Sequence, residues 1–586
     1  MKRRIRTLRW FGSESTQKGS GYRPIKFVLV FAALSVCSSW LFAQPPRLRL
    51  GQRQTKPVQN LPVQNLPVQN QAGQNQAGQN VPVATKQPND PPSTGLQANP
   101  IQPPSDPPIT VATEEEKNQK IATDWQNPWL VFYITGNQYG YLEPCGCTGL
   151  ANQKGGINRK DTLLKSLKNR GWQVIPLDAG DQVRRDGVQS EIKFNWTTQA
   201  LRQMGYKATT YGGKDLLLSD NILISVLNEN AENDLFVSAN VSMLPDHDVR
   251  YKILTVDGPD KKPRKIGITG VLGQESLKAH AGVNQGFFSA SAPIPALKEV
   301  VAKLTQEKCD YQILLANASL EETRKIVQDV PGFQLVITSG GYGEPTYRPE
   351  VLPGSSSEIV QAGTKGMYAG IVGLFNDPAS PTRYQRIALS SQFEDSPRML
   401  ELFGKYQDEL RNKADDNFSA LGLRPTSHPS GRSFTGTAKC GECHTTAHEI
   451  WTKTPHAHAT DSIVKPPERS MARHFDPECI SCHVTGWNPQ KFSPYKTGYE
   501  TLESSVDLHG NGCENCHGPG LEHVQAEEDA ASDKKKLEEL RASMRLTLAN
   551  AQEKCLECHD IDNSPDFHKE GAFEKYWEQV KHYGKD

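Results

Sequence analysis

The chain lacks a net charge, because its 66 Lys and Arg residues balance its 66 Asp and Glu residues. A nucleic-acid-binding surface usually shows as an excess of basic residues, so this balance argues against a nucleic-acid partner. Cysteine is also scarce over most of the chain, where only Cys37, Cys145, Cys147 and Cys309 precede residue 436. The remaining cysteines of the twelve lie between positions 440 and 558, which indicates a specialised C-terminal region.

One apolar run of membrane-relevant length, FVLVFAALSVCSSWLFA, lies near the start and follows a basic leader that contains KRRIRTLRW and RPIK. This order is typical of a secretory signal peptide or of a short membrane anchor. Residues 1–43 are therefore predicted to direct export to a periplasmic or other extracytoplasmic space. Cleavage after Ala43 and retention as a membrane tether are the two alternatives.

Residues 44–126 are rich in Pro, Gln and Asn and contain the repeat PVQNL PVQNL PVQNQ AGQNQ AGQN. Such a composition buries too little apolar surface to offset the loss of chain entropy on folding. We predict a disordered linker that separates the following residues from the leader.

Between residues 127 and 395, short apolar runs alternate with amphipathic stretches, which predicts a layered α/β domain with ligand positions at the strand ends. The predicted strands are WLVFYIT, WQVIPLDAG, LFVSANV, RKIGITGV, YQILLANA and FQLVITSG. The predicted helices cover residues 157–170, 191–204, 292–307 and 320–329.

Three segments of this middle region, taken in order, carry a family resemblance: GGINRKDTLLKSL, LDAGD and IVQAGTKGMYAGIVGL. They resemble a helix, a metal-site strand and a late strand pair of the calcineurin-like metallophosphoesterases, in their exported 5'-nucleotidase branch. The resemblance implies a metallophosphoesterase-like sandwich. It also implies hydrolysis of phosphate esters by two metal ions, which are held by carboxylates, imidazoles and an amide.

Most of those ligands are replaced in this sequence. The family's Asp-x-His-Gly motif falls on residues 137–140, where Asn137 and Tyr139 stand in place of Asp and His. Its Gly-Asn-His-Glu motif falls on residues 212–215, where Lys214 replaces the histidine. The inherited metal site is therefore predicted to be degenerate.

The later ligand strands carry the same signal, since Asn317 in LLANAS stands where a histidine is expected and SGGYGE has none. Asp181 in LDAGD is the residual metal position that matches the family. We predict that the middle region serves as a scaffold or binding domain and that it holds no divalent metal. A working metal-dependent phosphoesterase or 5'-nucleotidase with accessory haems is the alternative.

After a predicted helix and linker at 396–435, the residues from 436 to 586 contain four Cys-x-x-Cys-His motifs. They are CGECH (Cys440, Cys443, His444), CISCH (Cys479, Cys482, His483), CENCH (Cys513, Cys516, His517) and CLECH (Cys555, Cys558, His559). This pattern attaches c-type haem, because two thiols bond to the porphyrin and the adjacent histidine becomes the proximal iron ligand.

Zinc sites and disulfides are the competing interpretations of paired cysteines in an exported protein. Neither explains a histidine directly after the second cysteine in all four copies. We therefore predict four c-type haems. Since the region has few long apolar runs, the porphyrins are expected to form the core of a mostly α, haem-packed domain.

The segments WTKTPHAHA, DPECISCHVTG, GCENCHGPGLEH and CLECHDIDNSPDFHKEGAFEKYW are similar to the tetrahaem cytochrome c-554 type of multihaem cytochrome c. That resemblance implies His456 and His523 as distal iron ligands. His582 and His509 are the next candidates. Ligation by two histidines favours electron transfer, whereas a haem that lacks a distal ligand could bind a small nitrogen compound.

Cys145 and Cys147, in the stretch NQYGYLEPCGC, belong to none of these motifs. The pair is interpreted as a strained redox disulfide, as soft-metal ligands, or as one bond to Cys309 with a thiol left over. Together the patterns predict an exported electron carrier with redox partner proteins and a possible membrane tether. A multihaem oxidoreductase that acts on a small nitrogen compound at an open haem is the further alternative, and the oligomeric state is not predicted.

Overall fold

The computed structural model of the chain describes residues 111–584, except 145–148, 228–229, 231–232, 281–287, 342, 415–417, 467–470 and 562. The described residues all fall within one compact unit. The predicted leader at 1–43 and most of the predicted linker lie outside the described residues. Among the helices that are described, none combines the length and the apolar character needed to cross a membrane.

The last part of the predicted linker is ordered, which corrects the expectation of disorder up to residue 126. Ala112, Ala122 and Trp125 are buried, and a short helix, α1 (Glu114–Lys117), begins with a capping box on Thr113. Ala122 and Trp125 add to the core of the middle region. The ordered domain therefore begins at about residue 111, because a few apolar residues at the end of a polar segment suffice to pack it.

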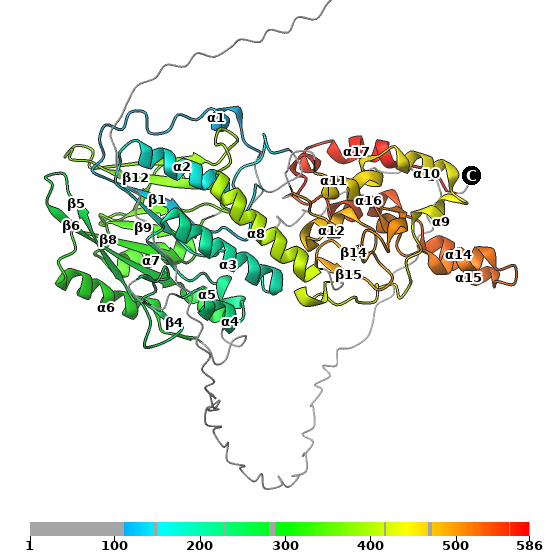
Figure 1. The fold of residues 1–586 in the computed structure, drawn as a ribbon, viewed down its shortest axis with the longest axis horizontal. Helices are drawn as coiled ribbons and strands as arrows, with labels where there is room; N and C mark the ends of the chain where they lie inside the picture. The colour runs from blue at the N-terminus through cyan, green and yellow to red at the C-terminus, as the bar shows by residue number, and fades with distance from the viewer. Residues whose placement is uncertain are drawn as a thin grey trace, which may run out of the picture. The chain divides into compact units, whose positions relative to one another are not determined.

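Two mixed β-sheets form the centre of the middle region (Figure 1). The first sheet has the order β13 (Thr382–Ala388), β12 (Tyr368–Leu374), β1 (Leu130–Thr135), β2 (Val174–Asp178) and β3 (Ala208–Thr209). The second has the order β10 (Glu350–Val351), β11 (Glu358–Gln361), β9 (Leu335–Thr338), β8 (Tyr311–Asn317), β6 (Pro263–Leu272) and β5 (Lys252–Asp257). Two short strands, β4 (Val241–Ser242) and β7 (Ser289–Ala290), pair apart from them.

The sheets pack face to face and helices cover their outer faces, which gives the predicted layered sandwich (Figure 1). Successive residues of β1 show the arrangement, since Phe132 lies in the core between the sheets and Tyr133 in the core beneath the helices. The helices over the first sheet are α2 (Ile157–Asn169), α3 (Val188–Met204) and α8 (Pro397–Ala414). Those over the second are α6 (Pro293–Gln306) and α7 (Leu320–Asp329).

Parallel pairing places the predicted ligand loops at one edge of the sandwich. β1 pairs with β2 so that Thr135 faces Asp178, and β6 pairs with β8 so that Leu272 faces Asn317. The loops that follow these strands therefore meet. Two short helices, α4 (Asp220–Ser225) and α5 (Gln274–His280), lie in the connections that follow β3 and β6.

The predicted strand LFVSANV does not form. Its residues make an isolated bridge between Thr209 and Phe236 and then enter the two-residue strand β4. Asn240 explains the break, because its side chain bonds to Leu272 and Ser291 and takes the place of a strand ladder. The sequence reasoning also missed β5 and β13, which are partly exposed strands with mixed polar and apolar residues.

The C-terminal region is mostly helical, as predicted, with one short hairpin of β14 (Trp487–Asn488) and β15 (Ser493–Pro494). Its helices are α9 (Thr437–Gly441), α10 (Thr445–Thr452), α11 (Ala459–Val464), α12 (Pro477–His483), α13 (Cys513–His517), α14 (Leu521–Glu528), α15 (Lys534–Ser543), α16 (Leu548–Leu556) and α17 (Ala572–Val580). Few of their residues are fully buried, which fits a domain whose core is supplied by bound groups.

Candidate functional site

The loop after β1 contains the residues that replace the first family motif. Asn137 is buried, and its side-chain amide donates hydrogen bonds to the carbonyl oxygens of Ser339 and Gly363, at 2.8 and 2.7 Å. Its Oδ1 atom is buried with no hydrogen-bond partner in the described part of the chain. Because a neutral amide oxygen supplies only one weak ligand, this position does not replace the carboxylate that a divalent ion requires.

Tyr139 and Lys214 occupy the histidine positions of the family's first two motifs discussed above, and they contact each other. The Lys214 ammonium lies 3.8 Å from the centre of the Tyr139 ring. A cation over an aromatic face is a favourable arrangement in itself. The ammonium places a positive charge where the family binds metal, so these residues do not fit a divalent cation.

Asp181 and Asp215 are both buried, and their carboxylates accept hydrogen bonds from main-chain N–H groups. Asp215 accepts hydrogen bonds from the N–H groups of Asp181, Gln182, Val183 and Gly212. Asp181 Oδ1 accepts from the N–H of Lys214 at 2.9 Å. Burial raises the pKa of Asp181 and, together with the charge of Asp181, that of Asp215.

Asn317, at the end of β8, completes this arrangement. Its Oδ1 accepts from the N–H of Gly213 at 3.0 Å and its amide donates to Ala179 O at 3.2 Å. Asp181 and Asn317 thus lie at the same edge of the sandwich, as the resemblance implied. Their side chains form hydrogen bonds between the loops there. Over the described residues, no group of three or more His, Cys, Asp or Glu side chains could hold a metal ion.

A buried lysine lies beneath the same loop. The Lys160 ammonium donates to Gln138 Oε1 at 2.5 Å, and both side chains are almost completely buried. Burial lowers the pKa of Lys160 to about 8, against the opposing attraction of Asp178. The interior of this edge therefore holds a lysine and an amide beside the buried carboxylates of Asp178, Asp181 and Asp215.

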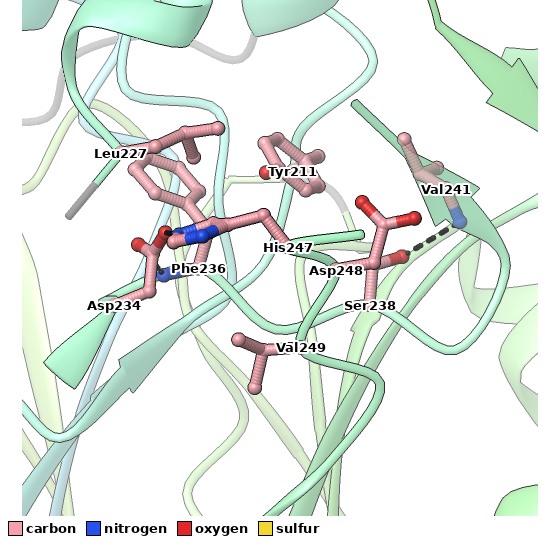
Figure 2. A pocket seen from close by; sticks show the side chains of 9 residues that line it. All are labelled: Tyr211, Leu227, Asp234, Phe236, Ser238, Val241, His247, Asp248 and Val249. Carbon is pink, nitrogen blue, oxygen red and sulfur yellow. Dashed lines mark hydrogen bonds and ion pairs between the residues drawn. The ribbon is translucent and has the colours of Figure 1, made fainter. Parts of the chain in front are cut away.

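A separate small cavity lies beside β4 and has a volume of about 10 Å³ (Figure 2). Figure 2 shows His247 directed at Asp234, whose Oδ2 is 3.3 Å from His247 Nε2. A cavity of this size holds about one water molecule, so it offers no site for an organic ligand.

Cys145 and Cys147 lie outside the described residues, so their redox and soft-metal interpretations stay predictions. Cys309 is a free, partly buried thiol near the end of α6. Burial raises its pKa, which makes it a poor nucleophile. The interpretation that bonds Cys309 to Cys145 or Cys147 involves these residues as well and stays a prediction.

The four Cys-x-x-Cys-His motifs lie on short helices. CGECH and CLECH begin in the last turns of α9 and α16, CISCH forms the end of α12, and CENCH is the whole of α13. The sulfur atoms of Cys440 and Cys513 lie close to each other, and so do those of Cys482 and Cys558. The first motif therefore adjoins the third, and the second adjoins the fourth.

In all four motifs, the Nδ1 atom of the histidine is turned toward an oxygen of the chain. The four distances are His444 to Gly584 O at 3.4 Å, His483 to Ala459 O at 2.8 Å, His517 to Met544 O at 2.6 Å and His559 to Ser564 Oγ at 3.0 Å. Histidines that bind metal typically donate the other ring N–H in this way, which fixes the tautomer and directs Nε2 at the ion. These residues therefore fit the predicted proximal ligands.

Two of the predicted distal histidines lie opposite a motif histidine. The ring centres of His456 and His559 are 5.9 Å apart, and those of His517 and His582 are 5.7 Å apart. Two imidazoles that hold one metal ion from opposite sides, each nitrogen about 2.0–2.1 Å from the ion, place their ring centres about 6 Å apart. The spacing of both pairs matches this arrangement.

His523 lies near the first motif. Its pKa is lowered by burial and, to a lesser extent, by the positive charge of His444, and no ring contact between the two histidines is found among the described residues. His509, by contrast, uses Nε2 in a 3.0 Å contact with Leu502 O and packs beside Tyr499. The structure therefore places two of the four distal candidates, His456 and His582, beside motif histidines, and places His509 in a different setting.

The sequence reasoning missed a set of charged residues that joins the second motif to the middle region. Glu478, next to Cys479, forms ion pairs with Arg185 and with Lys193 of α3. Burial opposes ionisation of Glu478, but the two cations hold its pKa below the usual value. No short motif signals these contacts, because the partners are far apart in the sequence.

Comparisons with known proteins match the middle and the C-terminal regions to different proteins. Residues 439–518 match the family model described as cytochrome c554 and c-prime. Over 148 residues the chain is 30% identical to cytochrome c-554 of Nitrosomonas europaea, covering 22% of this chain and 60% of that protein. The middle region is 26% identical over 287 residues to a 5'-nucleotidase of Diplobatis ommata, covering 44% of this chain and 47% of that protein.

Among solved structures, the chain is similar to a 5'-nucleotidase precursor from Thermus thermophilus. The sequence identity is 16% and the TM-score is 0.41, over 57% of this chain and 66% of that one. The chain thus spans between about half and two thirds of the lengths of these proteins. The middle and C-terminal regions therefore match two different groups of proteins.

Proposed function

We propose that the protein is an exported multihaem c-type cytochrome that transfers electrons through four covalently bound haems. The observation that carries this proposal is the common orientation of the four motif histidines, each of which holds Nδ1 on an oxygen and leaves Nε2 for iron. The likeness to cytochrome c-554 supports haem binding. Export to the periplasm is supported by the leader sequence and by the extracytoplasmic chemistry that c-type attachment requires.

In this proposal the eight motif cysteines attach the porphyrins, and His444, His483, His517 and His559 are the proximal ligands. His523, His582 and His456 are the distal ligands opposite His444, His517 and His559. The bound haems supply reversible one-electron chemistry. The chain fixes the ring orientations through Nδ1 and excludes other ligands by holding two imidazoles in place.

Spectroscopy of the oxidised holoprotein tests these ligand pairs. Electron paramagnetic resonance should show low-spin iron at the sites of His444, His517 and His559. A His582→Ala variant should convert the signal of one site from low-spin to high-spin and leave the others unchanged. A matched His509→Ala variant should leave every low-spin signal in place. Loss of a low-spin signal in the His509 variant, or no change in the His582 variant, would contradict the assignment.

The second motif favours one additional function, binding of a small ligand at an open haem. Among the described residues, a second histidine ring lies 5.7 Å from that of His517 and 5.9 Å from that of His559, whereas no such ring pair is found for His444 or His483. The Nδ1 atom of His483 is held by Ala459 O and Ser462 Oγ. Carbon monoxide titration of the reduced protein should then detect one binding site per chain, and zero sites would contradict this second function.

The middle region is proposed to be a scaffold that holds the cytochrome region, with redox proteins as the partners of the haems. Its phosphoesterase-like fold keeps Asp181 but ties that carboxylate to the main chain of Lys214. The same edge carries the Tyr139–Lys214 contact, which does not fit a divalent ion. We therefore derive no hydrolytic step from it.

A further inference from the structure

The second attachment helix, α12, lies in the same core as helices of the middle region. Ile480 of α12 and Val484, the residue after it, are completely buried. They belong to the apolar core that also contains Phe403 and Tyr406 of α8. The helix that carries Cys479, Cys482 and His483 is thus packed as part of the larger domain.

Two cations of the middle region hold the first turn of α12. Lys193 Nζ lies 2.6 Å from Glu478 Oε2, and Arg185 pairs with the other oxygen of the same carboxylate. The Lys193 side chain is only 10% exposed, so the pair is screened less by solvent than an ordinary surface ion pair. These two cations and Glu478 are called the α12 clamp below.

Hydrogen bonds flank the α12 clamp on both sides. Gln189 donates to Asp476 Oδ1, the N-cap of α12, at 2.9 Å and to the Tyr406 hydroxyl at 3.2 Å. On the approach to the helix, Arg473 pairs with Glu143 at 2.8 Å. Glu143 belongs to the loop after β1, and Arg185 and Gln189 follow β2. The segment that leads into α12 is therefore bound by residues that follow β1 and β2, where the phosphoesterase family holds its metal ions.

The other three attachment helices are held within the C-terminal region. Lys439 of α9 pairs with Glu528, and Glu514 of α13 accepts hydrogen bonds from Thr435 and Gly436. Lys554 of α16 pairs with Glu557. Contact of this kind with the middle region distinguishes α12 from α9, α13 and α16 within the described residues.

We propose that the middle region acts as a positioning domain for the second haem, and that the α12 clamp sets the reduction potential of that haem separately from the other three. This inference rests on the proposed function, because it requires a haem at Cys479 and Cys482. Lys193, Arg185 and Glu478 are positioning residues, since they act through α12 and touch no iron ligand in the structure.

The charges of the α12 clamp predict the direction in which the midpoint potential of the second haem shifts in each variant. Reduction adds an electron to the haem, so a nearby positive charge favours the reduced state and a nearby negative charge opposes it. Removing the Lys193 charge should lower the midpoint potential of the second haem, whereas removing the Glu478 charge should raise it. Removing both should cancel the charge effect, so any shift that remains in the double variant reports the lost position of α12.

The experiment is a potentiometric titration of the full-length holoprotein, followed by visible and paramagnetic resonance spectra. The variants are Lys193→Met, Glu478→Gln, the double variant, and Lys193→Arg as the conservative rescue. His483→Met identifies which transition belongs to the second motif. Arg324→Met is the matched control, because Arg324 pairs with Glu350 at 2.7 Å on α7 and β10, elements that do not contact α12 in the core.

We expect the transition of the second haem to move down in Lys193→Met and up in Glu478→Gln, with the other three transitions unchanged. Lys193→Arg and Arg324→Met should match the original protein. Unchanged potentials in both single variants, or four transitions that shift together, would overturn the inference. A haem count below four per chain would instead overturn the proposed function, so the two failures are distinguishable.

Discussion

Replacement of Asp215 by Asn tests whether the former metal edge is now a structural device. Asp215 Oδ1 accepts from the N–H groups of Gln182 and Val183, and Oδ2 accepts from those of Asp181 and Gly212. An Asn side chain keeps one oxygen and turns an NH₂ group toward the second pair of donors. The substitution therefore leaves two buried N–H groups unbonded.

A buried donor left unsatisfied costs about 1–3 kcal/mol, so Asp215→Asn should lower the free energy of unfolding by about 2–6 kcal/mol. The control is Asp246→Asn, which changes an exposed carboxylate and should cost less than about 0.5 kcal/mol. Urea unfolding of both holoprotein variants, followed by far-ultraviolet circular dichroism, measures the difference.

The same assay separates a structural carboxylate from a metal ligand. If Asp215 acts through its hydrogen bonds, dialysis of the unsubstituted protein against a chelator should leave the unfolding midpoint unchanged. A loss below about 0.5 kcal/mol in Asp215→Asn would refute the hydrogen-bond reasoning. A fall in stability after chelation, restored by Mn²⁺ or Zn²⁺, would refute the view that this edge has lost its metals.

Three further outcomes follow from buried charges. The pKa of Lys160 is about 8 in the folded protein and 10.5 ordinarily, so between these pH values only the unfolded state holds the proton. The free energy of unfolding should therefore rise with pH over this range, by at most about 3 kcal/mol. Urea titrations at several pH values should show this rise, and Lys160→Met should abolish it. In phosphatase assays with added Mn²⁺ or Zn²⁺, the original protein and Asp181→Asn should show the same background rate. Turnover that is lost in Asp181→Asn would restore the hydrolase alternative. Glu116→Gln weakens the ion pair to the buried Lys154 and should speed proteolysis near residues 111–126, with an unchanged rate as the contrary result.

The sandwich could be predicted from the sequence because its central elements carry local signals. WLVFYIT became β1 with one residue trimmed, and the helix predicted at 157–170 is α2. LFVSANV failed because Asn240 competes for main-chain groups through its side chain, which an apolar pattern does not reveal. The partly exposed strand β5 was missed for a related reason, since its residues follow no clear alternation of burial.

In the candidate site too, residues with a local sequence signal could be predicted and residues placed by distant packing could not. Short motifs predicted the haem cysteines and the adjacent histidines, because attachment chemistry demands a fixed spacing. The pairing of His456 with His559 depends on how distant segments pack, and position alone could not place it. His509 was chosen for its closeness to Cys513 in the sequence, yet its ring is directed to Leu502. The clamp on Glu478 gave no sequence signal, since single charged residues are common on any surface.

The haem content of the purified full-length protein is the most direct test of the central claim. A pyridine haemochrome assay with independent protein quantification gives the number of haems per chain, and the mass of the intact protein checks that each is covalently bound. Four attached haems per chain are expected, falling to three in a Cys555→Ser, Cys558→Ser double variant. Fewer than four in the unsubstituted protein, or zinc bound at the motif cysteines, would contradict the account.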